Sequence, residues 1–487
     1  MNYRIIFRMI GKLLLVEAFL LILPLIVSFI YKEDLYWSYL IPIISLLLVG
    51  GICSSLKLKH KDFFAKEGFV IVGLSWIILS LFGCLPFIIS KSIPNFVDAY
   101  FETISGFTTT GATIIKDGYI EVLPHSILFW RSFTHWIGGM GILVFVLAIL
   151  PKSEGSNIHI LRAESPGPSV DKIVSKVKIS ARILYGIYIV LTIIQIIFLL
   201  FGKMPLFDSI VHTFATAGTG GFSIKNDSIA SYNDYCQIVI GIFMILFGVN
   251  FNCFYLLLIG NFKRLFKSEE FAWYLGIIFV AIVFITLDLS YDVTSLDTGI
   301  SFATNLKNAF FHVASIITTT GFTISNIDLW PLFSKFIIIL LMFIGACAGS
   351  TGGGIKVSRI AILVKNAKRA VKKLLHPRSV ANIRFEGEIV EERVVSETLN
   401  YFIVIMLLFV LGNIILSLDP TVKSLETSIS AVAACLNNVG PGFGSVSVTF
   451  AGLNVLSKIT LIISMLIGRL EIFPILILFS WKTWKKN

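Results

Sequence analysis

The sequence is poor in charged residues. Asp, Glu, Lys and Arg make up only 14% of its 487 residues, whereas a soluble domain carries about 25%. Hydrophobic residues make up 56%, and 42 of the residues are phenylalanine. This balance excludes an ordinary soluble globular domain and predicts a polytopic membrane protein.

Cysteine is scarce, and familiar catalytic patterns are absent. The six cysteines stand singly inside apolar segments without CxxC spacing, so we predict neither a disulfide framework nor a metal site built on thiolates. The seven histidines are scattered, and no HExxH, GxSxG or Walker-type spacing occurs. We therefore expect no enzymatic activity and no cofactor held by this chain.

Long apolar runs dominate the chain instead. Crossing a hydrocarbon core of about 30 Å takes about 20 apolar residues. Because ten runs of this kind occur and ten is even, both termini are expected on one side of the membrane. The first run lacks a signal-peptide cleavage pattern and is expected to be retained. The ten candidate spans lie near residues 6–30, 38–56, 68–90, 126–150, 181–202, 236–260, 271–290, 334–363, 398–418 and 455–481.

The positions of the basic residues predict the orientation. Six segments hold 29 of the 40 Lys and Arg residues: 1–12, 57–66, 151–182, 261–270, 356–393 and 482–487. By the positive-inside rule, these segments and both termini are expected in the cytoplasm. The net charge of +11 is thus mainly a topology signal. We expect no nucleic-acid partner, because the basic residues are spread among short loops.

Four short, related stretches recur in matching surroundings. Each follows a moderately apolar run and precedes a polar tail, and long apolar segments flank each on both sides. The pattern predicts four copies of a helix, a short helix, a loop and a second helix. The stretches are TTTGAT at 108–113, GTGGFS at 218–223, TTTGFT at 318–323 and NNVGPG at 437–442.

The recurring glycine and the polar residues before it suit a cation selectivity filter. Such a filter replaces the water around an ion with oxygens, and backbone carbonyls can supply these where the chain adopts unusual dihedral angles. Threonine hydroxyls add further oxygens on a stiff frame, and a short helix ending at the loop directs its partially negative C-terminus toward the ion. The candidate filter residues are Thr109, Thr110, Gly111, Thr219, Gly220, Gly221, Thr319, Thr320, Gly321, Asn438, Val439 and Gly440.

The alternative is that these glycines merely mark turns between membrane helices. A second periodicity argues against it, because each filter glycine is followed by another glycine at almost constant spacing. Gly139, Gly248, Gly349 and Gly468 lie 28, 27, 28 and 28 residues after Gly111, Gly221, Gly321 and Gly440.

The second apolar span of the third repeat contains a candidate gate. The run from Ile344 to Lys356 interrupts the span with five glycines and two hydroxyl residues, and each glycine costs a helix about 1 kcal/mol relative to alanine. We expect an unwound segment just cytoplasmic of the filter. Alternative interpretations are a phosphate-binding loop, which lacks the preceding strand, and close helix packing through small residues. The candidate gate residues are Gly345, Gly349, Ser350, Thr351, Gly352, Gly353, Gly354 and Arg469.

Arg469 is included because it lies within an apolar span, where a lone cation costs about 3 kcal/mol or more unless it faces water or a partner. Since Gly349 and Gly468 occupy matching positions, Arg469 is expected near the glycine-rich break, facing the pore below the filter. The alternative is a pair with Glu471, although residues two apart on a helix do not face each other.

Other polar residues near the filter are given structural roles. Arg131 and His135 are interpreted as residues near the outer interface, beside Trp130 and Trp136. Glu102 matches His212 and His312 and is expected to orient the filter. The basic segment 364–397 is interpreted as a helix on lipid headgroups, or else as a docking surface for a soluble regulator.

Taken together, these motifs resemble one family. The filter glycines, HWIGGMGILVF, RAESPGPSVDKIVSKVKISAR, GSTGGGIK and GRLEIFPIL are similar to the membrane subunits of bacterial Trk-type potassium uptake systems, which are TrkH-like members of the Trk/Ktr/HKT superfamily. The likeness covers nearly the whole chain. The two extra leading spans are more similar to the TrkH branch than to the Ktr branch.

The resemblance implies an all-α polytopic membrane protein with four fused repeats around a central pore and two leading transmembrane helices. It also implies K+ at the filter, gating by the glycine-rich loop and Arg469, and a homodimer with one pore per protomer in the bacterial inner membrane. A cytosolic TrkA-like ring that responds to NAD or ATP/ADP would regulate the pore. The expected units are a leading pair at 1–62 and repeats at 63–160, 161–268, 269–380 and 381–487.

Three functions remain open at this level. The first is a channel-like K+ pathway, which is favoured because the second spans contain no buried Asp or Glu that would serve as an obvious proton relay. The second is coupled uptake, either by proton symport or by a Ktr-type Na+-dependent transporter. The third is a membrane receptor or enzyme that shares the repeated helix pairs. Because the second repeat has Gly218 and Gly220 and the fourth has asparagines, modest discrimination against Na+ and Rb+ is expected.

Overall fold

The computed structural model describes residues 1–57, 65–141, 177–291, 301–378 and 381–484. These residues are almost entirely helical. In this part of the chain, the only strands are β1 (Arg384–Phe385) and β2 (Glu388–Ile389), which pair in an antiparallel hairpin. The all-α architecture expected from the sequence is confirmed.

The leading pair is a helical hairpin that packs through glycine. Helices α1 (Tyr3–Leu20) and α2 (Ile22–Ile30) form one apolar span, and α3 (Tyr36–Ser54) returns along α1. A Cβ added at Gly11 would lie 2.5 Å from Ser54 N, and one at Gly50 would lie 2.9 Å from Gly11 O. The absence of side chains at these two positions therefore allows the backbones to approach closely.

The rest of the described chain repeats one pattern four times. An outer helix is followed by a short helix that ends at the glycine stretch, and a second helix then returns. The outer helices are α4 (Ala65–Gly83, continued by α5, Leu85–Ile89), α10 (Val177–Phe201), α15 (Glu269–Tyr291) and α20 (Glu392–Leu416). The short helices are α6 (Phe96–Phe107), α11 (Leu206–Ala217), α17 (Phe302–Ile317) and α21 (Leu425–Leu436). The second helices are α7 (His125–Gly139), α12 (Asp234–Phe247), α18 (Leu332–Ile344) and α22 (Val455–Arg469).

Six of the ten expected spans are long apolar helical segments, two of which are made of two successive helices. Among the described residues, six helical segments are long and apolar enough to cross a membrane: Tyr3–Ile30, Tyr36–Ser54, Lys66–Ile89, Ala181–Phe201, Glu269–Tyr291 and Glu392–Leu416. They correspond to the leading pair and to the outer helix of each repeat.

The other four expected spans are not continuous helices. The third-repeat span breaks between α18 and α19 (Val357–Leu375), as its glycines predict. In the second repeat, α12 and α13 (Phe251–Leu258) meet at 91°. In the fourth, α22 ends at Arg469, and α23 (Ile472–Phe479) starts after Glu471, whose φ is +52°. The expectation of continuous spans at 236–260 and 455–481 was therefore wrong. The first-repeat span is helical to Gly139, and residues 142–150 lie outside the described part.

The matched glycines explain where the second helices stop. Gly139 ends α7, Gly248 follows α12, Gly349 lies in the break after α18, and Gly468 is the penultimate residue of α22. A Cβ at Gly468 would lie 2.1 Å from Leu436 O, at the end of α21. A Cβ at Gly139 would lie 2.7 Å from Gly218 Cα, whereas Gly248 and Gly349 face the side chains of Tyr274 and Asn250. Each matched position therefore lies close to a neighbouring segment, where a small residue is needed.

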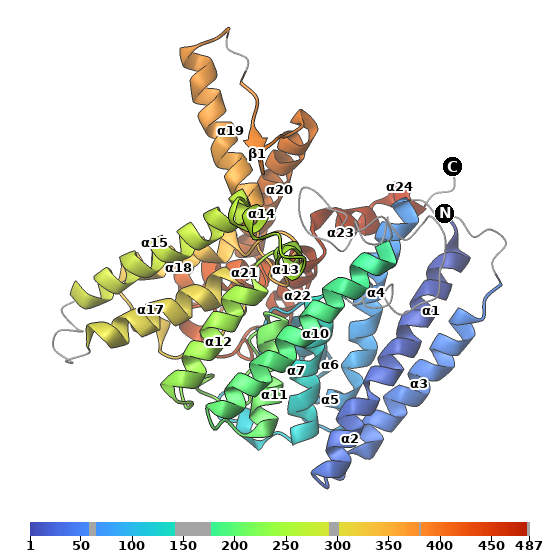
Figure 1. Cartoon of the computed structure of the whole chain (residues 1–487). Helices are drawn as coiled ribbons and strands as arrows, with labels where there is room; N and C mark the ends of the chain where they lie inside the picture. Colours follow the sequence, from blue (N-terminus) through green and yellow to red (C-terminus); the bar gives the residue numbers. More distant parts are fainter. Residues whose placement is uncertain (58–64, 142–176, 292–300, 379–380, 485–487) are drawn as a thin grey trace.

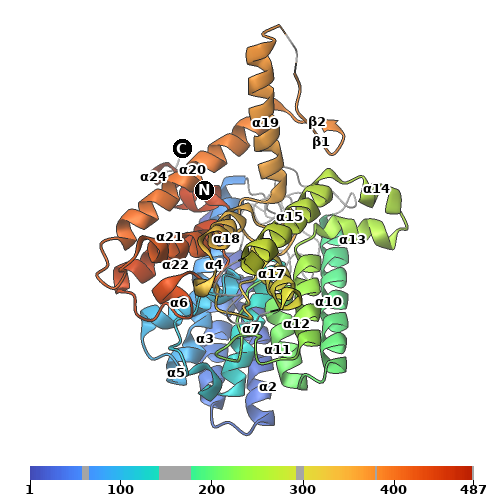
Figure 2. The same ribbon diagram turned by 90° about the vertical axis from the view of Figure 1, so that its left-hand side faces the viewer.

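Both termini lie at one end of the molecule (Figure 1). From the same end, α19 projects away from the helical body together with the β1–β2 hairpin, as Figure 2 also shows. The small helices α14 (Phe262–Phe266) and α24 (Trp481–Trp484) lie toward this end as well. The polypeptide thus has one end with both termini and a projecting segment, and an opposite end made of loops.

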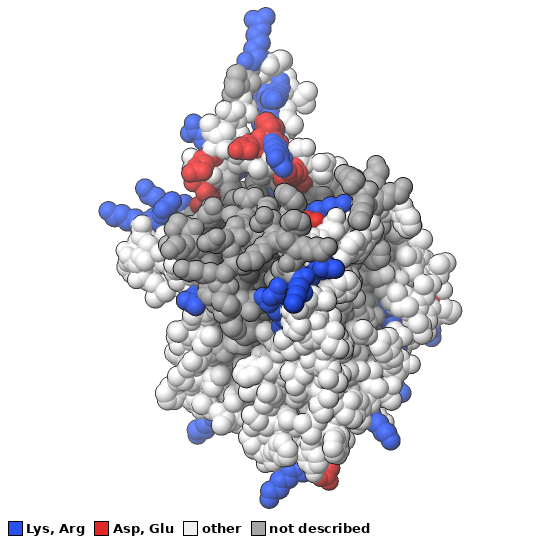
Figure 3. All heavy atoms as spheres, turned by 90° about the vertical axis from the view of Figure 1, so that its right-hand side faces the viewer, with Lys and Arg blue, Asp and Glu red and all other residues white. Residues whose placement is uncertain are grey.

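Charged side chains are also concentrated at the end from which α19 projects. In Figure 3, blue and red side chains gather at the projecting end, and on the face shown the body below it is a broad, mostly uncharged belt. Large apolar side chains are exposed on the leading pair and on the outer helices, among them Leu48 at 63%, Phe279 at 68% and Leu407 at 64%. An exposed apolar surface of this kind is typical of protein that faces lipid.

Candidate functional site

The four glycine stretches begin at the C-terminal ends of the four short helices. In each repeat, the amide of the residue before the filter glycine donates to a carbonyl in the last turn of the helix. This shared bond ties each loop to its helix in the same way. The bonds run from Thr110 N to Ser105 O (2.9 Å), from Gly220 N to Ala215 O (2.8 Å), from Thr320 N to Ser315 O (2.8 Å) and from Val439 N to Ala434 O (2.8 Å).

The backbone conformation is also the same in all four loops. The residue two before each filter glycine is left-handed, with φ of +53° at Thr109, +54° at Thr219, +57° at Thr319 and +55° at Asn438. The filter glycines are left-handed too, with φ of +80°, +72°, +87° and +105° at Gly111, Gly221, Gly321 and Gly440. A β-branched residue rarely adopts positive φ, so three threonines at this position mark backbone that its surroundings hold in a strained conformation.

The four loops close into a ring. A Cβ built on each filter glycine would meet the carbonyl oxygen of the residue before the glycine in the next repeat. The distances are 1.9 Å from Gly111 to Gly220 O, 1.9 Å from Gly221 to Thr320 O, 2.2 Å from Gly321 to Val439 O and 2.6 Å from Gly440 to Thr110 O. Each repeat therefore contacts the next, and the fourth contacts the first. The loops surround one axis, and their backbones are in direct contact.

A polar residue on each short helix holds the tail that leaves the ring. His212 Nε2 lies 3.1 Å from Ser223 Oγ, and His312 Nε2 lies 3.0 Å from Ser325 Oγ. In the fourth repeat, Ser430 Oγ accepts from Phe443 N at 2.8 Å. These contacts hold the segment after the filter glycine against the short helix in the second, third and fourth repeats. They fit the expectation that His212 and His312 orient the filter.

In the first repeat, a buried ion pair holds the segment that follows the filter glycine. Glu102 accepts from Arg131 Nε at 2.7 Å and from Ile114 N at 2.8 Å. The side chains of Arg131 and Glu102 are 1% and 0% exposed. Arg131 also donates to Ser223 O, on the tail of the second repeat. The interpretation of Arg131 as an outer-interface residue was therefore wrong. Its partner Glu102 lies 29 residues away, and the sequence pattern did not connect the two.

His135 is likewise buried rather than interfacial. A Cβ at Gly220 would lie 2.3 Å from His135 Cγ, and one at Gly218 would lie 2.2 Å from His135 O. The imidazole stacks on Phe222 with ring centroids 4.2 Å apart. The two extra glycines of the second repeat thus make room for His135, which explains the departure of this repeat from the threonine pattern.

The fourth repeat substitutes an amide for the threonine hydroxyl. Asn438 Nδ2 donates to Thr110 Oγ1 at 2.9 Å and to Met465 O at 3.0 Å. The asparagine therefore joins the fourth loop to the first loop and to α22.

The glycine-rich break of the third repeat runs directly beneath the ring. Gly353 N donates to Thr319 Oγ1 at 2.6 Å. A Cβ at Gly352 would lie 2.9 Å from Thr318 O, and one at Gly353 would lie 2.4 Å from Asn437 O. The loop touches the underside of the ring on the third-repeat and fourth-repeat sides, and only glycine fits there.

Arg469 contacts the break, as the matched glycines predicted. It donates from Nη1 to Thr351 O at 2.8 Å and from Nη2 to Gly139 O at 2.7 Å, with Gly138 O as a further acceptor. It thereby joins the break to the end of α7. The alternative partner, Glu471, forms an ion pair with Arg359 at 2.8 Å.

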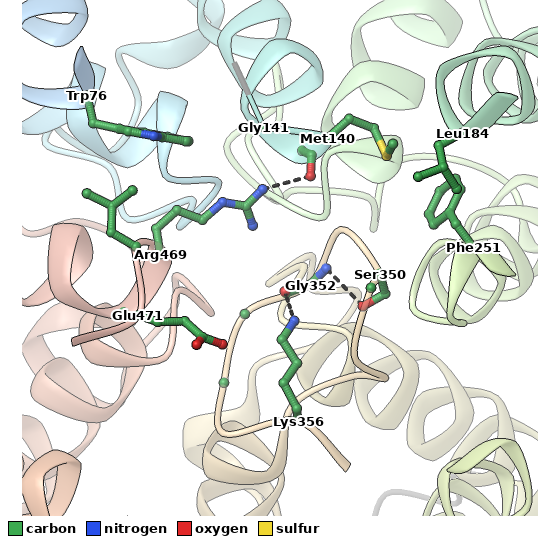
Figure 4. Close-up of a pocket in the computed structure, with 16 residues that line it drawn as sticks. Trp76, Met140, Gly141, Leu184, Phe251, Ser350, Gly352, Lys356, Arg469 and Glu471 are labelled. Carbon is green, nitrogen blue, oxygen red and sulfur yellow. Dashed lines mark hydrogen bonds between the residues drawn. The ribbon is translucent and has the colours of Figure 1, made fainter. Parts of the chain in front are cut away.

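A pocket lies between the break and the ends of α7 and α22. Arg469 and Lys356 both point into it, and Lys356 Nζ donates to Gly352 O (Figure 4). Lys356 is 2% exposed and has a φ of +82°. Lys356 was not among the residues predicted from the sequence to form the gate. Its signal was a lysine two residues after three consecutive glycines inside an apolar span.

The remaining candidate gate residues shape the break itself. Gly345, Gly349 and Gly354 have φ of +73°, +69° and +76°. Ser350 Oγ donates to Cys347 O at 2.7 Å, and Thr351 Oγ1 donates to Phe247 O at 3.2 Å. The structure thus brings all the candidate filter and gate residues together around one axis. Among the described residues there is no cluster of His, Cys, Asp or Glu that could hold a metal ion.

Comparison with known proteins gives a consistent result. A family model described as TrkH, cation transport protein, matches residues 40–486. The Trk system potassium uptake proteins TrkH of Salmonella typhimurium and Escherichia coli are each 37% identical to this chain over the full length of both. TrkG of Escherichia coli is 33% identical over 99% of each chain. The crystal structure of the potassium transporter TrkH from Vibrio parahaemolyticus matches with a TM-score of 0.87 and 34% identity, covering all of both chains.

Proposed function

The chain belongs to the TrkH family of cation transport proteins, and from that premise we propose that it mediates potassium uptake through the ring of four glycine loops. The observation that carries the proposal is the closed ring. Four loops of the same conformation place four backbone carbonyls against four glycines around one axis. Carbonyl oxygens arranged in this way can replace the hydration shell of K+.

The short helices add a favourable potential for a cation. Each ends at the ring, so the partially negative C-terminus of each is directed toward the axis. The buried carboxylate of Glu102, which holds the tail of the first loop, is neutralised by Arg131. In this proposal selectivity arises from backbone geometry, with the filter residues named above as the K+ site.

The glycine-rich loop and two cations form the gate. Residues 345–356 run beneath the ring, and Arg469 and Lys356 place two positive charges in the pocket on the far side. Positive charge below the filter raises the energy of a permeating cation. An open state therefore requires this loop and Arg469 to separate, which the glycines permit.

The difference between the two ends of the molecule supports a location in the bacterial inner membrane with both termini in the cytoplasm. The termini and the projecting α19 share one end, and charged side chains gather there (Figures 1 and 3). Basic residues favour the cytoplasmic side. The outer surface of the uncharged belt is apolar and contacts membrane lipid.

The regulation is proposed from family membership. The relatives are named as parts of a Trk system, which supports a further component. We assign nucleotide sensing, by NAD or ATP/ADP, to a separate cytosolic TrkA-like ring, and we assign a homodimer to the membrane subunit. The projecting segment offers an accessible surface for such a ring.

Uptake of radioactive rubidium ions into proteoliposomes tests the proposal. The purified chain is reconstituted alone, as wild type and as Arg469→Ala, and uptake is measured against unlabelled K+ or Na+ and with or without an imposed pH gradient. We expect uptake that K+ inhibits at lower concentrations than Na+ and that the pH gradient does not drive. Absence of uptake in both variants, or equal inhibition by the two ions, would contradict the proposal. Uptake driven by the pH gradient would indicate proton symport.

A further inference from the structure

A single buried carboxylate holds the first half of the glycine-rich loop. Glu270, in the first turn of α15, is 5% exposed, and its Oε1 accepts from Ala348 N at 2.7 Å. Its Oε2 lies 3.5 Å from Nδ2 of Asn250, at the bend between α12 and α13. Phe251 N, at the same bend, donates to Gly349 O at 3.1 Å. Glu270 therefore fixes the loop and the bend together.

A carboxylate from a distant, exposed segment caps the same helix. Glu386 lies in the turn of the β1–β2 hairpin with a φ of +53°. Its Oε1 accepts from Ser268 Oγ at 2.9 Å and from Glu270 N at 2.8 Å. The first amides of a helix have no partner within the helix, and a carboxylate placed there satisfies them and complements the helix dipole. Here the cap comes from a residue 116 positions away.

The β1–β2 hairpin also contacts the projecting helix α19. Lys365 of α19 donates to Arg384 O at 2.7 Å and pairs with Glu269, the first residue of α15. Ile383 packs with Ile362 of α19 and Val395 of α20 in a small apolar cluster. A displacement of the hairpin thus reaches the start of α15 directly.

Two bonds through one residue connect this exposed hairpin with the loop beneath the filter. Glu386 binds the amide of Glu270, and the carboxylate of Glu270 binds the amide of Ala348. We propose that Glu270 is a positioning residue that keeps the loop in its closed position, and that Glu386 sets the position of Glu270 according to the placement of the hairpin. The inference rests on the proposed gate and names the contact through which a cytoplasmic event reaches it.

The reactivity of Cys347 tests this link independently of transport. Cys347 lies within the loop and is 1% exposed, so it is protected while the loop is closed. Detergent-purified wild type, Glu270→Gln, Glu386→Gln, the double variant and Glu388→Gln are treated with a water-soluble maleimide, and labelling of the Cys347 peptide is followed by mass spectrometry. Glu388 is the matched control, because it is an exposed glutamate of the same hairpin with no hydrogen bond to α15 among those of the described residues.

We expect Cys347 to react about tenfold faster in Glu270→Gln, because the neutral amide oxygen accepts from Ala348 N more weakly than the carboxylate does. Glu386→Gln is expected to increase the rate about fivefold, because a neutral amide complements the helix dipole less well than a carboxylate, and Glu388→Gln to leave it unchanged. The double variant should match Glu270→Gln, because the two residues act in series.

Equal labelling of wild type and Glu386→Gln, or additive effects in the double variant, would overturn the link. Since Glu386 is exposed, unfolding does not complicate that variant. Rubidium flux, measured in parallel, separates the two proposals. Changed labelling without flux in any variant would support the link and contradict K+ transport.

Discussion

The imidazole of His135 occupies the space that a side chain at position 220 would need. A Cβ at Gly220 would lie 2.3 Å from His135 Cγ and 2.4 Å from Nδ1. Thr110 and Thr320 stand at the equivalent positions of the first and third repeats. The second repeat therefore differs from its relatives because a histidine of α7 fills the threonine site.

This relationship predicts a compensating pair. Gly220→Thr alone should lower the free energy of unfolding by about 1–3 kcal/mol, because a side chain is forced against the buried ring. Combining it with His135→Ala should restore most of that loss. Thermal unfolding of the detergent-purified protein measures both, with His135→Ala alone as the control. An effect of Gly220→Thr that is the same with and without His135 would show that the ring is not the cause.

The buried ion pair between Glu102 and Arg131 predicts a large and local effect. Glu102→Gln should destabilise the protein by about 3–5 kcal/mol, because the arginine is left charged and without its counter-ion in the interior. The matched control is Glu121→Gln, which breaks the surface pair with Lys225, where the side chains are 44% and 36% exposed. Such a pair contributes about 0–1 kcal/mol. Similar losses of thermal stability in the two variants would contradict the assigned role of the buried pair.

Arg469 is predicted to keep the gate closed both through the hydrogen bonds of its guanidinium group and through its positive charge. Arg469→Ala should increase K+ flux about tenfold or more, since one hydrogen bond to a charged group contributes about 1.5–3 kcal/mol. Arg469→Lys keeps the charge but cannot reach Thr351 O and Gly139 O together, so a smaller increase is expected. Flux into proteoliposomes measures both variants. A flux for Arg469→Lys as high as that for Arg469→Ala would mean that the charge itself contributes nothing.

The repeated architecture could be predicted from the sequence because its signals are local and recur. The glycines at 111, 221, 321 and 440 mark positive φ in every loop, and such positions restrict the residue type strongly. The expected proximity of Arg469 to the break followed from the matched glycines. The six long apolar segments followed from length and hydropathy alone.

What could not be predicted depends on contacts between distant residues. The contact of His135 with Gly220 joins the first and second repeats, and that of Glu270 with Ala348 joins residues 78 positions apart within the third repeat. No periodicity encodes either contact. The breaks after α12 and α22 were missed because one glycine in an apolar run is compatible with a continuous helix. In the structure the break is required by packing, since Gly468 lies against Leu436 O.

The central claim is that the ring of four glycine loops selects K+. Its most direct test is the ratio of K+ to Na+ flux through Gly321→Ser in proteoliposomes, with Gly186→Ser as the control, because a Cβ at Gly186 meets nothing within 4 Å. At Gly321 a Cβ would lie 2.2 Å from Val439 O, and φ is +87°, so the added side chain must displace the carbonyl of the next repeat. We expect Gly321→Ser to lose its preference for K+ and Gly186→Ser to keep the wild-type ratio. An unchanged preference for K+ in a folded Gly321→Ser protein would contradict the claim.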